Sequence, residues 1–160
     1  MKKTNYVVVD INSKTELFNK FNKNQISDNL AQYIIINAKK ELSIKNIKLV
    51  IRQNIPLTIQ EQKNLIDAIR EYFGLRVREK MMYLRINNTK QIVLSIVGIL
   101  LIVLSEVLSI SFEYLIPELL LIAGWITVWE VLDSILFVNS KIKIEKKIYK
   151  KLSSCEIDFQ

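Results

Sequence analysis

The feature that most constrains this sequence is a long stretch, from Gln91 to Ser140, that contains no lysine or arginine. Most of its residues are isoleucine, leucine or valine. A helix of about 20 apolar residues crosses the roughly 30 Å hydrocarbon core of a bilayer, so the stretch is long enough for two such helices. We therefore expect an α-helical hairpin over 91–138 that crosses a membrane twice, with spans over 92–110 and 115–138.

A soluble protein with two buried apolar helices is the alternative to membrane insertion. The rest of the chain is too small to wrap two helices of this length that are apolar all round, which argues for lipid around them. The break between the helices is set by the residues Ser111, Phe112, Glu113, Tyr114 and Pro117. Proline suits the first turn of a helix, where its missing N–H is not needed.

Basic residues on both flanks of the apolar stretch predict its orientation. They are Arg76, Arg78, Lys80, Arg85 and Lys90 before it, and Lys141, Lys143, Lys146, Lys147, Lys150 and Lys151 after it. Positively charged flanks stay on the cytosolic side, so we expect both termini in the cytoplasm and the hairpin in the inner (cytoplasmic) membrane. Attraction to anionic headgroups accounts for the net charge of +7 without a nucleic-acid partner.

Residues 1–88 have the pattern of a small cytosolic α/β domain. Tyr6–Ile11 and Ile47–Arg52 are β-branched runs that predict strands. Between them a helix with Ser27 as its N-cap presents an apolar face made of Leu30, Tyr33, Ile34, Ala38 and Leu42. A second helix begins at Thr58 with a capping box to Glu61, presents Leu65, Ile66, Ile69 and Phe73, and ends at Gly74. The expected fold class is a small α+β domain (β-α-β-α) plus the transmembrane hairpin.

Two segments complete this domain in ways that the pattern leaves partly open. Leu75–Arg78 and Met82–Ile86 fit a pair of strands, but residues 75–88 also fit a basic helix that continues into the membrane. Residues 139–160 read as a basic cytosolic tail. Within it Cys155–Phe159 alternates apolar with acidic, and we suggest that it returns as an edge strand on the cytosolic sheet.

The inventory of reactive residues favours a protein that is not an enzyme. The chain has no histidine, one cysteine and three widely spaced glycines, and it contains no phosphate-loop or metal-binding motif. We therefore expect no catalytic residue, cofactor or metal site. Asp10 fits the end of a strand better than a catalytic carboxylate, and Cys155 lacks a basic neighbour that would activate its thiol.

Four acidic residues inside the apolar stretch are the most informative side chains. A charge near the centre of a membrane helix costs roughly 2.5–3.5 kcal/mol, so these carboxylates should face protein or water, or be protonated. Neither helix offers them a basic partner. Trp125 and Trp129 lie two turns and one turn before Asp133, where their indole N–H groups would reach a carboxylate. The predicted intramembrane polar site comprises Glu106, Glu118, Trp125, Trp129, Glu130 and Asp133; snorkelling to headgroups is the alternative for Glu106 and Glu118.

The first apolar helix carries a surface of small residues, Gly98, Ser105 and Ser109, that predicts close helix packing. The second contains GWITVWE, from Gly124 to Glu130. With a short α/β domain before it and a basic tail after it, this segment resembles uncharacterised small bacterial membrane proteins with two transmembrane helices. The resemblance covers chiefly the second helix and implies no particular activity.

The leading hypothesis from the sequence is a non-enzymatic membrane protein that forms homo-oligomers through its hairpin. Its cytosolic domain would bind a protein partner or a signal. The alternative is an oligomeric cation-conducting or membrane-permeabilising effector gated by that domain, since two helices alone enclose no pathway. A membrane-attached enzyme ranks third.

Overall fold

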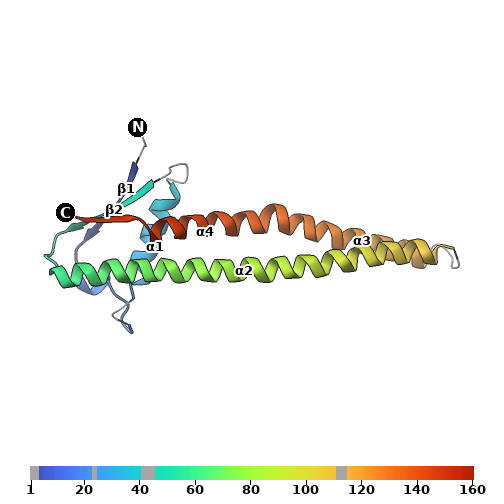
Figure 1. Cartoon of the computed structure of the whole chain (residues 1–160), viewed down its shortest axis with the longest axis horizontal. Helices are drawn as coiled ribbons and strands as arrows, with labels where there is room; N and C mark the ends of the chain where they lie inside the picture. The colour runs from blue at the N-terminus through green and yellow to red at the C-terminus, as the bar shows by residue number, and fades with distance from the viewer. Residues whose placement is uncertain (1–3, 23–24, 41–45, 111–114) are drawn as a thin grey trace. The chain divides into compact units, whose positions relative to one another are not determined.

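The structure, a computed structural model, describes residues 4–22, 25–40, 46–110 and 115–160. It is mostly helical, with one small parallel sheet and two long apolar helices (Figure 1). Its elements are β1 (Thr4–Ile11), the 3-10 turn η1 (Lys14–Glu16), α1 (Asp28–Lys40), β2 (Asn46–Gln53), α2 (Ile59–Leu108), α3 (Leu115–Asp133), the π-helical segment η2 (Ser134–Val138), α4 (Asn139–Ser153) and β3 (Glu156–Phe159). The chain divides into two compact units, one of Met1–Glu79 with Glu145–Gln160 and one of Lys80–Ile144.

The sheet of the first unit has the order β1-β2-β3, and both pairs of strands are parallel. One of its faces is apolar and buried, as Val7, Val9 and Leu49 show. Successive side chains of a strand point to opposite faces, so the residues between the buried ones lie on the other face. That face carries charged side chains. There the Lys48 ammonium lies 2.6 Å from Asp158 and 3.5 Å from Glu156. The hydrogen bond to Asp158 and the charges of both acids raise the pKa of Lys48.

Three helices supply the apolar layer that packs on the buried face of the sheet. Their core residues recur at three- and four-residue steps, as an amphipathic helix requires. They are Ala31, Ile34 and Ala38 of α1, Leu65, Ala68, Ile69 and Phe73 of α2, and Ile148 and Leu152 of α4. Tyr33, which the sequence pattern placed on the buried face, is instead 49% exposed, because Ile34 and Ala38 fill that side. Leu42 lies outside the described residues.

The C-terminal strand β3 lies at the position where Cys155–Phe159 predicted an edge strand. It pairs with β2 in a register that sets Lys48 opposite Glu156 and Val50 opposite Asp158. The Cys155 thiol before it is buried, and burial raises its pKa. The last residues of the chain therefore belong to the same folded unit as the first strands.

The predicted helix end at Gly74 is wrong, since α2 continues without a break to Leu108. Gly74 does not adopt the positive φ of a helix-ending glycine. A glycine inside a helix costs about 1 kcal/mol, and the good helix formers that follow, among them Leu75, Arg76 and Glu79, offset it. Residues 75–88 are accordingly helical, which decides between the two possibilities that the sequence left open.

The second apolar helix also continues further than expected. After α3 the chain passes through η2 directly into α4, so most of the predicted tail is helical. Pro117 lies in the first turn of α3, where a proline is tolerated. The other residues expected to set the break, 111–114, lie outside the described part of the chain.

Candidate functional site

The two apolar helices approach each other closely at Gly98 of α2 and Gly124 of α3. A Cβ atom added to Gly124 would lie 2.7 Å from Cγ1 of Ile102 and 3.1 Å from the carbonyl oxygen of Gly98. A Cβ added to Gly98 would lie 3.1 Å from Cγ2 of Val128. A Cβ at Gly124 would force a shift and one at Gly98 would be tightly crowded, so this pair packs as small-residue helix contacts do.

A second contact lies nearer the end of α2. Ser105 is buried, and its hydroxyl donates a hydrogen bond of 2.6 Å to the carbonyl oxygen of Pro117. Ser109 is exposed and bonds within its own helix, to the carbonyl oxygen of Glu106. Of the three residues predicted to form the packing surface, Gly98 and Ser105 therefore lie at the helix contact and Ser109 does not.

At the other end of the helix pair, five polar side chains form an amide cluster: Asn87, Asn88 and Gln91 of α2, Ser134 of η2 and Asn139 of α4. Asn87 donates to the Ser134 hydroxyl at 3.0 Å and to the Asn139 side-chain carbonyl at 2.8 Å, and Gln91 donates to Ser134 at 2.8 Å. Asn139 donates to Asn88 at 3.1 Å and to Gln91 at 3.2 Å. Gln91 and Asn139 are buried, so these bonds satisfy groups that water does not reach.

The geometry of the π-helical segment η2 explains how Ser134 of η2 and Asn139 of α4 both reach this cluster. Residues five apart in an α-helix point about 140° away from each other. The wider turn of η2, in which the N–H of Asn139 bonds to the carbonyl oxygen of Ser134, brings both side chains to the same side. Such π segments are frequent at functional sites. Sequence reasoning missed the cluster because Asn87, Asn88 and Gln91 indicated only where the apolar stretch begins.

The Glu130 carboxylate has a basic partner, which the sequence interpretation excluded. The Lys90 ammonium lies 2.9 Å from Oε1 of Glu130. Lys90 immediately precedes the stretch without lysine or arginine, and its long side chain reaches α3 from there. The prediction that neither helix offers a basic partner was therefore wrong for Glu130, and this acid connects α2 to α3.

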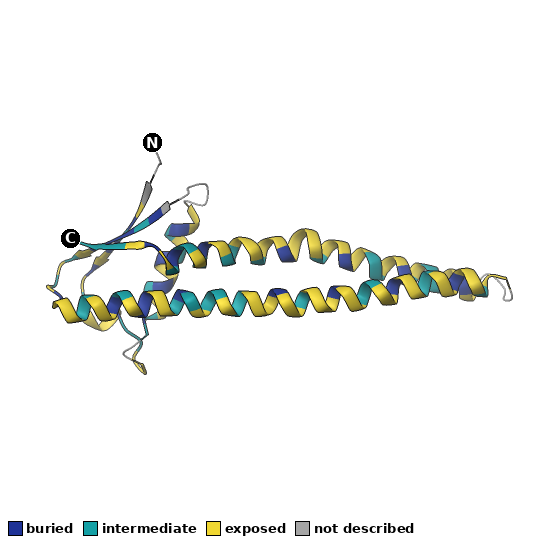
Figure 2. Ribbon diagram, in the orientation of Figure 1, coloured by how far each residue is buried: buried dark blue, intermediate teal, exposed yellow. Residues whose placement is uncertain are grey.

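The remaining residues of the predicted polar site do not converge. Glu118, Trp125, Trp129 and Asp133 form an outer face of α3, because Gly124 and Val131 of the same helix are the residues buried against α2. Trp125 is 61% and Trp129 72% exposed. Exposed residues make up much of the α3 ribbon (Figure 2). Among the described residues, neither indole bonds to a carboxylate and neither acid forms an ion pair. Glu106 is exposed on α2.

The α/β unit has a groove of about 910 Å³ at the carboxyl end of β1. Its walls come from Asp10 and Ile11 of β1, the segment that contains η1, and the first turns of α1. In sheets with parallel strands, ligands bind outside the carboxyl ends of the strands. The groove is therefore the candidate binding site of this unit.

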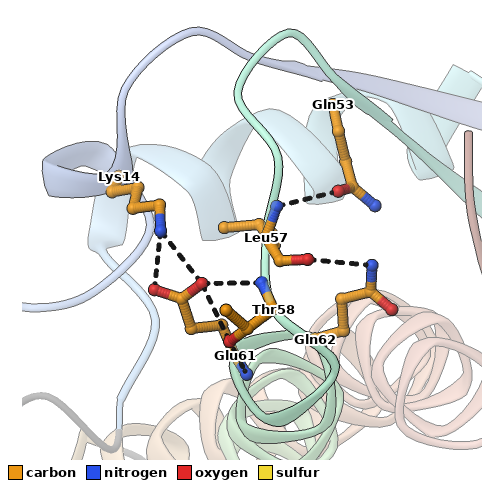
Figure 3. A network of polar contacts seen from close by, with 6 residues as sticks. All are labelled: Lys14, Gln53, Leu57, Thr58, Glu61 and Gln62. Carbon is orange, nitrogen blue, oxygen red and sulfur yellow. Dashed lines mark hydrogen bonds and ion pairs between the residues drawn. The ribbon is translucent and has the colours of Figure 1, made fainter.

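One wall of the groove is fixed to the start of α2 (Figure 3). The Lys14 ammonium lies 2.8 and 2.9 Å from the two carboxylate oxygens of Glu61. Glu61 also accepts the N–H of Thr58 at 2.8 Å, while Thr58 Oγ1 accepts the N–H of Glu61 at 3.2 Å, which confirms the predicted capping box. The bond from Lys14, followed by that from Thr58, lowers the pKa of Glu61 to about 2.

No protein family, curated protein or solved structure matches this chain. Lys14 and Glu61 connect the groove to α2, and α2 is one continuous helix from Ile59 to Leu108. The first turn of α2 contacts the groove wall, and its later turns carry the amide cluster and the glycine contact.

Proposed function

We propose that this chain is a non-enzymatic integral membrane protein whose helix pair anchors a small β-α-β-α domain in the cytosol. The observation that carries the proposal is the exposure of its apolar helices: only 17% of the most apolar window of the first and 11% of that of the second are buried. Core helices of a soluble protein would be mostly buried. In this proposal, residues 92–110 and 115–138 cross the inner (cytoplasmic) membrane as a hairpin.

The α/β unit contains segments from before and after the apolar helices, which supports a hairpin with both ends on one side of the membrane. The first turns of α2 and the last turns of α4 share one apolar core, in which the rings of Phe73 and Tyr149 stack at 6.2 Å. A single folded unit lies on one side of a membrane, so the chain must return to the side from which it entered. The basic residues of both flanks favour the cytosol and anionic headgroups.

The outer face of α3 supports assembly into homo-oligomers. Glu118 and Asp133 have no ion-pair partner among the described residues, and Trp125 and Trp129 expose their indole N–H groups. Carboxylates and indoles facing hydrocarbon are costly, whereas a second copy of α3 would let them bond to each other. We place the contact between subunits on this face, since the glycine face already packs against α2.

The groove and its connection to α2 support a role in binding a cytosolic protein or signal. A ligand that shifts η1 would change the bond between Lys14 and Glu61, and hence the first turn of α2. Because α2 continues into the apolar segment, the shift would reach the amide cluster. The cluster consists of five side chains, and a small rotation of α2 would rearrange the hydrogen bonds between them.

The test is the oligomeric state of the purified chain in detergent, measured by mass photometry and cross-linking. We expect an oligomer that Trp129→Leu combined with Asp133→Leu dissociates. Val103→Leu, on an exposed position of α2, is the matched control and should leave the oligomer intact. A wild-type monomer would exclude the assembly part of the proposal.

A second candidate function is an oligomeric cation-conducting effector, which the uncovered Glu118 and Asp133 favour. Glu130 is less suited to hold a cation than the sequence indicated, because Lys90 already neutralises it. Potassium flux through proteoliposomes, abolished by Asp133→Asn, would support this function. Proteoliposomes that contain the intact oligomer but show no potassium flux would exclude this function.

A further inference from the structure

The strand β1 has one open edge. The carbonyl oxygen of Ile11 accepts a hydrogen bond from the N–H of Asn54, directly after β2, so the backbone groups of Ile11 point toward β2. The direction of these groups alternates along a strand. The backbone groups that point away from β2 therefore belong to Tyr6, Val8 and Asp10.

No strand of the described residues lies on the open side of β1. The side chains of Tyr6 and Asp10, on one face of the sheet, are exposed, and that of Val8 is half-buried. Edge strands are commonly protected from further pairing by proline or lysine. The strand Thr4–Ile11 contains neither, and it has eight residues, long enough to accept another strand.

The groove at the carboxyl end of β1 shares Asp10 with this edge. Its apolar lining includes Phe18, Leu30, Phe21 and Tyr33, and Phe21 is 97% exposed. Large aromatic side chains at the surface are typical of sites where a partner binds. The strand edge offers backbone groups that a partner strand can pair with. The groove offers a pocket for every second side chain of that partner strand.

The charges that line the groove indicate the chemistry of its occupant. Asp10, Glu16 and Asp28 are acidic, and Lys20 is the one basic residue of the described lining. The Arg52 guanidinium lies 3.9 Å from Asp10, so Glu16 and Asp28 are the acids that a basic partner would meet. Lys14 lies in the same segment but binds Glu61 instead. The groove therefore favours a partner with basic side chains.

We propose that an extended segment of a partner protein, with alternating basic and apolar side chains, adds to β1 as a fourth strand and fills the groove. The inference rests on the proposed function and specifies its partner. A small polar ligand fits less well, because the buried side-chain polar atoms of the described residues all have hydrogen-bond partners. The groups left to bind are the backbone groups of the edge, which a peptide satisfies.

The experiment uses the full chain in detergent and an acetylated, fluorescein-labelled peptide of alternating lysine and valine, as long as β1. Fluorescence anisotropy should show saturable binding. An alternating glutamate and valine peptide should not bind. A lysine and valine peptide methylated on alternate backbone nitrogens should bind at least about tenfold more weakly, because it cannot form the strand bonds.

Two variants test the edge and the charge separately. Val8→Pro removes an outward N–H without removing a bond to β2, and it should weaken binding at least about tenfold, whereas Val8→Thr should not. Glu16→Gln should weaken binding and Glu71→Gln, an exposed acid outside the groove lining, should not. The methylated peptide tests the edge on the unaltered protein, should Val8→Pro fail to fold.

The inference is overturned by the absence of saturable binding of the lysine and valine peptide, by equal binding of its methylated form, or by equal binding to folded Val8→Pro. Loss of the oligomer in Val8→Pro would also overturn it, since a second copy would then occupy the edge. These failures differ from failure of the proposed function. That function fails if the helix pair does not cross a membrane, which peptide binding does not report.

Discussion

Lys14 and Glu61 lie far apart in the sequence, but their side chains meet at the start of α2. In the folded chain the pKa of Glu61 is about 2, against an ordinary value of 4.5. Because the folded pKa is the lower one, the carboxylate contributes its full stabilisation above about pH 4.5 and loses it as pH falls toward 2. The groove wall should therefore remain attached to α2 at neutral pH.

We predict that Glu61→Gln lowers the denaturation midpoint at pH 7 and flattens the loss of stability between pH 4.5 and 2. Circular dichroism of the chain in detergent, with denaturant titrations at several pH values, measures both effects. Glu71→Gln, on an exposed position of the same helix, is the control and should follow the wild-type pH dependence. Parallel curves for Glu61→Gln and wild type would show that this ion pair does not stabilise the unit.

The Asn139 side chain makes the most hydrogen bonds within the amide cluster: it accepts one and donates two. We predict that Asn139→Leu destabilises the helix pair by about 1–3 kcal/mol, because Asn87 and Gln91 lose a buried partner. Unfolding by steric trapping in micelles provides the measurement. Ser140→Leu, on the exposed neighbouring position, should change little. If both variants unfold alike, the cluster does not hold the helices together.

At the scale of elements, the contact between α2 and α3 depends on two glycines, whereas the third glycine has a different environment. We predict that replacing glycine by alanine changes the stability of the chain in opposite directions at Gly124 and at Gly74. Gly124→Ala should destabilise the chain by about 1–3 kcal/mol, since its methyl group would lie 2.7 Å from Ile102. Gly74→Ala should stabilise it by up to about 1 kcal/mol, because nothing lies within 4 Å and alanine is the better helix former. Thermal unfolding in detergent distinguishes them, and equal effects would refute the close approach.

The strand β3 contributes ion pairs and an edge to the sheet. We predict that removing residues 155–160 makes the α/β unit sensitive to protease, because Lys48 loses both acidic partners and β2 loses its neighbour. Limited trypsin digestion followed by mass spectrometry measures this. Glu156→Gln keeps the strand and should remain resistant. Unchanged resistance after the deletion would mean that β3 does not stabilise the unit.

The sequence predicted elements well where the signal was local and poorly where it depended on distant residues. The capping box of Thr58 and Glu61 and the alternation of Cys155–Phe159 are local patterns, and the structure contains both features. Gly74 led to a wrong helix end because glycine ends many helices. Here the residues after Gly74 favour the helix, and α2 continues through it. The partner of Glu130 and the members of the amide cluster could not be predicted, because the register between α2 and α3 depends on the Gly98–Gly124 approach, which local patterns do not specify.

At the scale of the whole molecule, the α/β unit contains segments from both sides of the helix pair. The chain enters the apolar segment through α2 and returns through α4 and β3 to the unit where it began. If the helix pair crosses a membrane, this closure requires an even number of crossings. Residues 1–79 and 145–160 must then lie in one compartment, and the segment between α2 and α3 must lie in the other.

The central claim, a hairpin with both ends in the cytosol, is tested most directly by reporter fusions in a bacterial host. Reporters active only in the cytoplasm or only outside it would be joined at residue 1, at residue 160 and at Tyr114. We predict cytoplasmic signals at residues 1 and 160 and an external signal at Tyr114. An external signal at residue 160, or a cytoplasmic signal at Tyr114, would contradict the account.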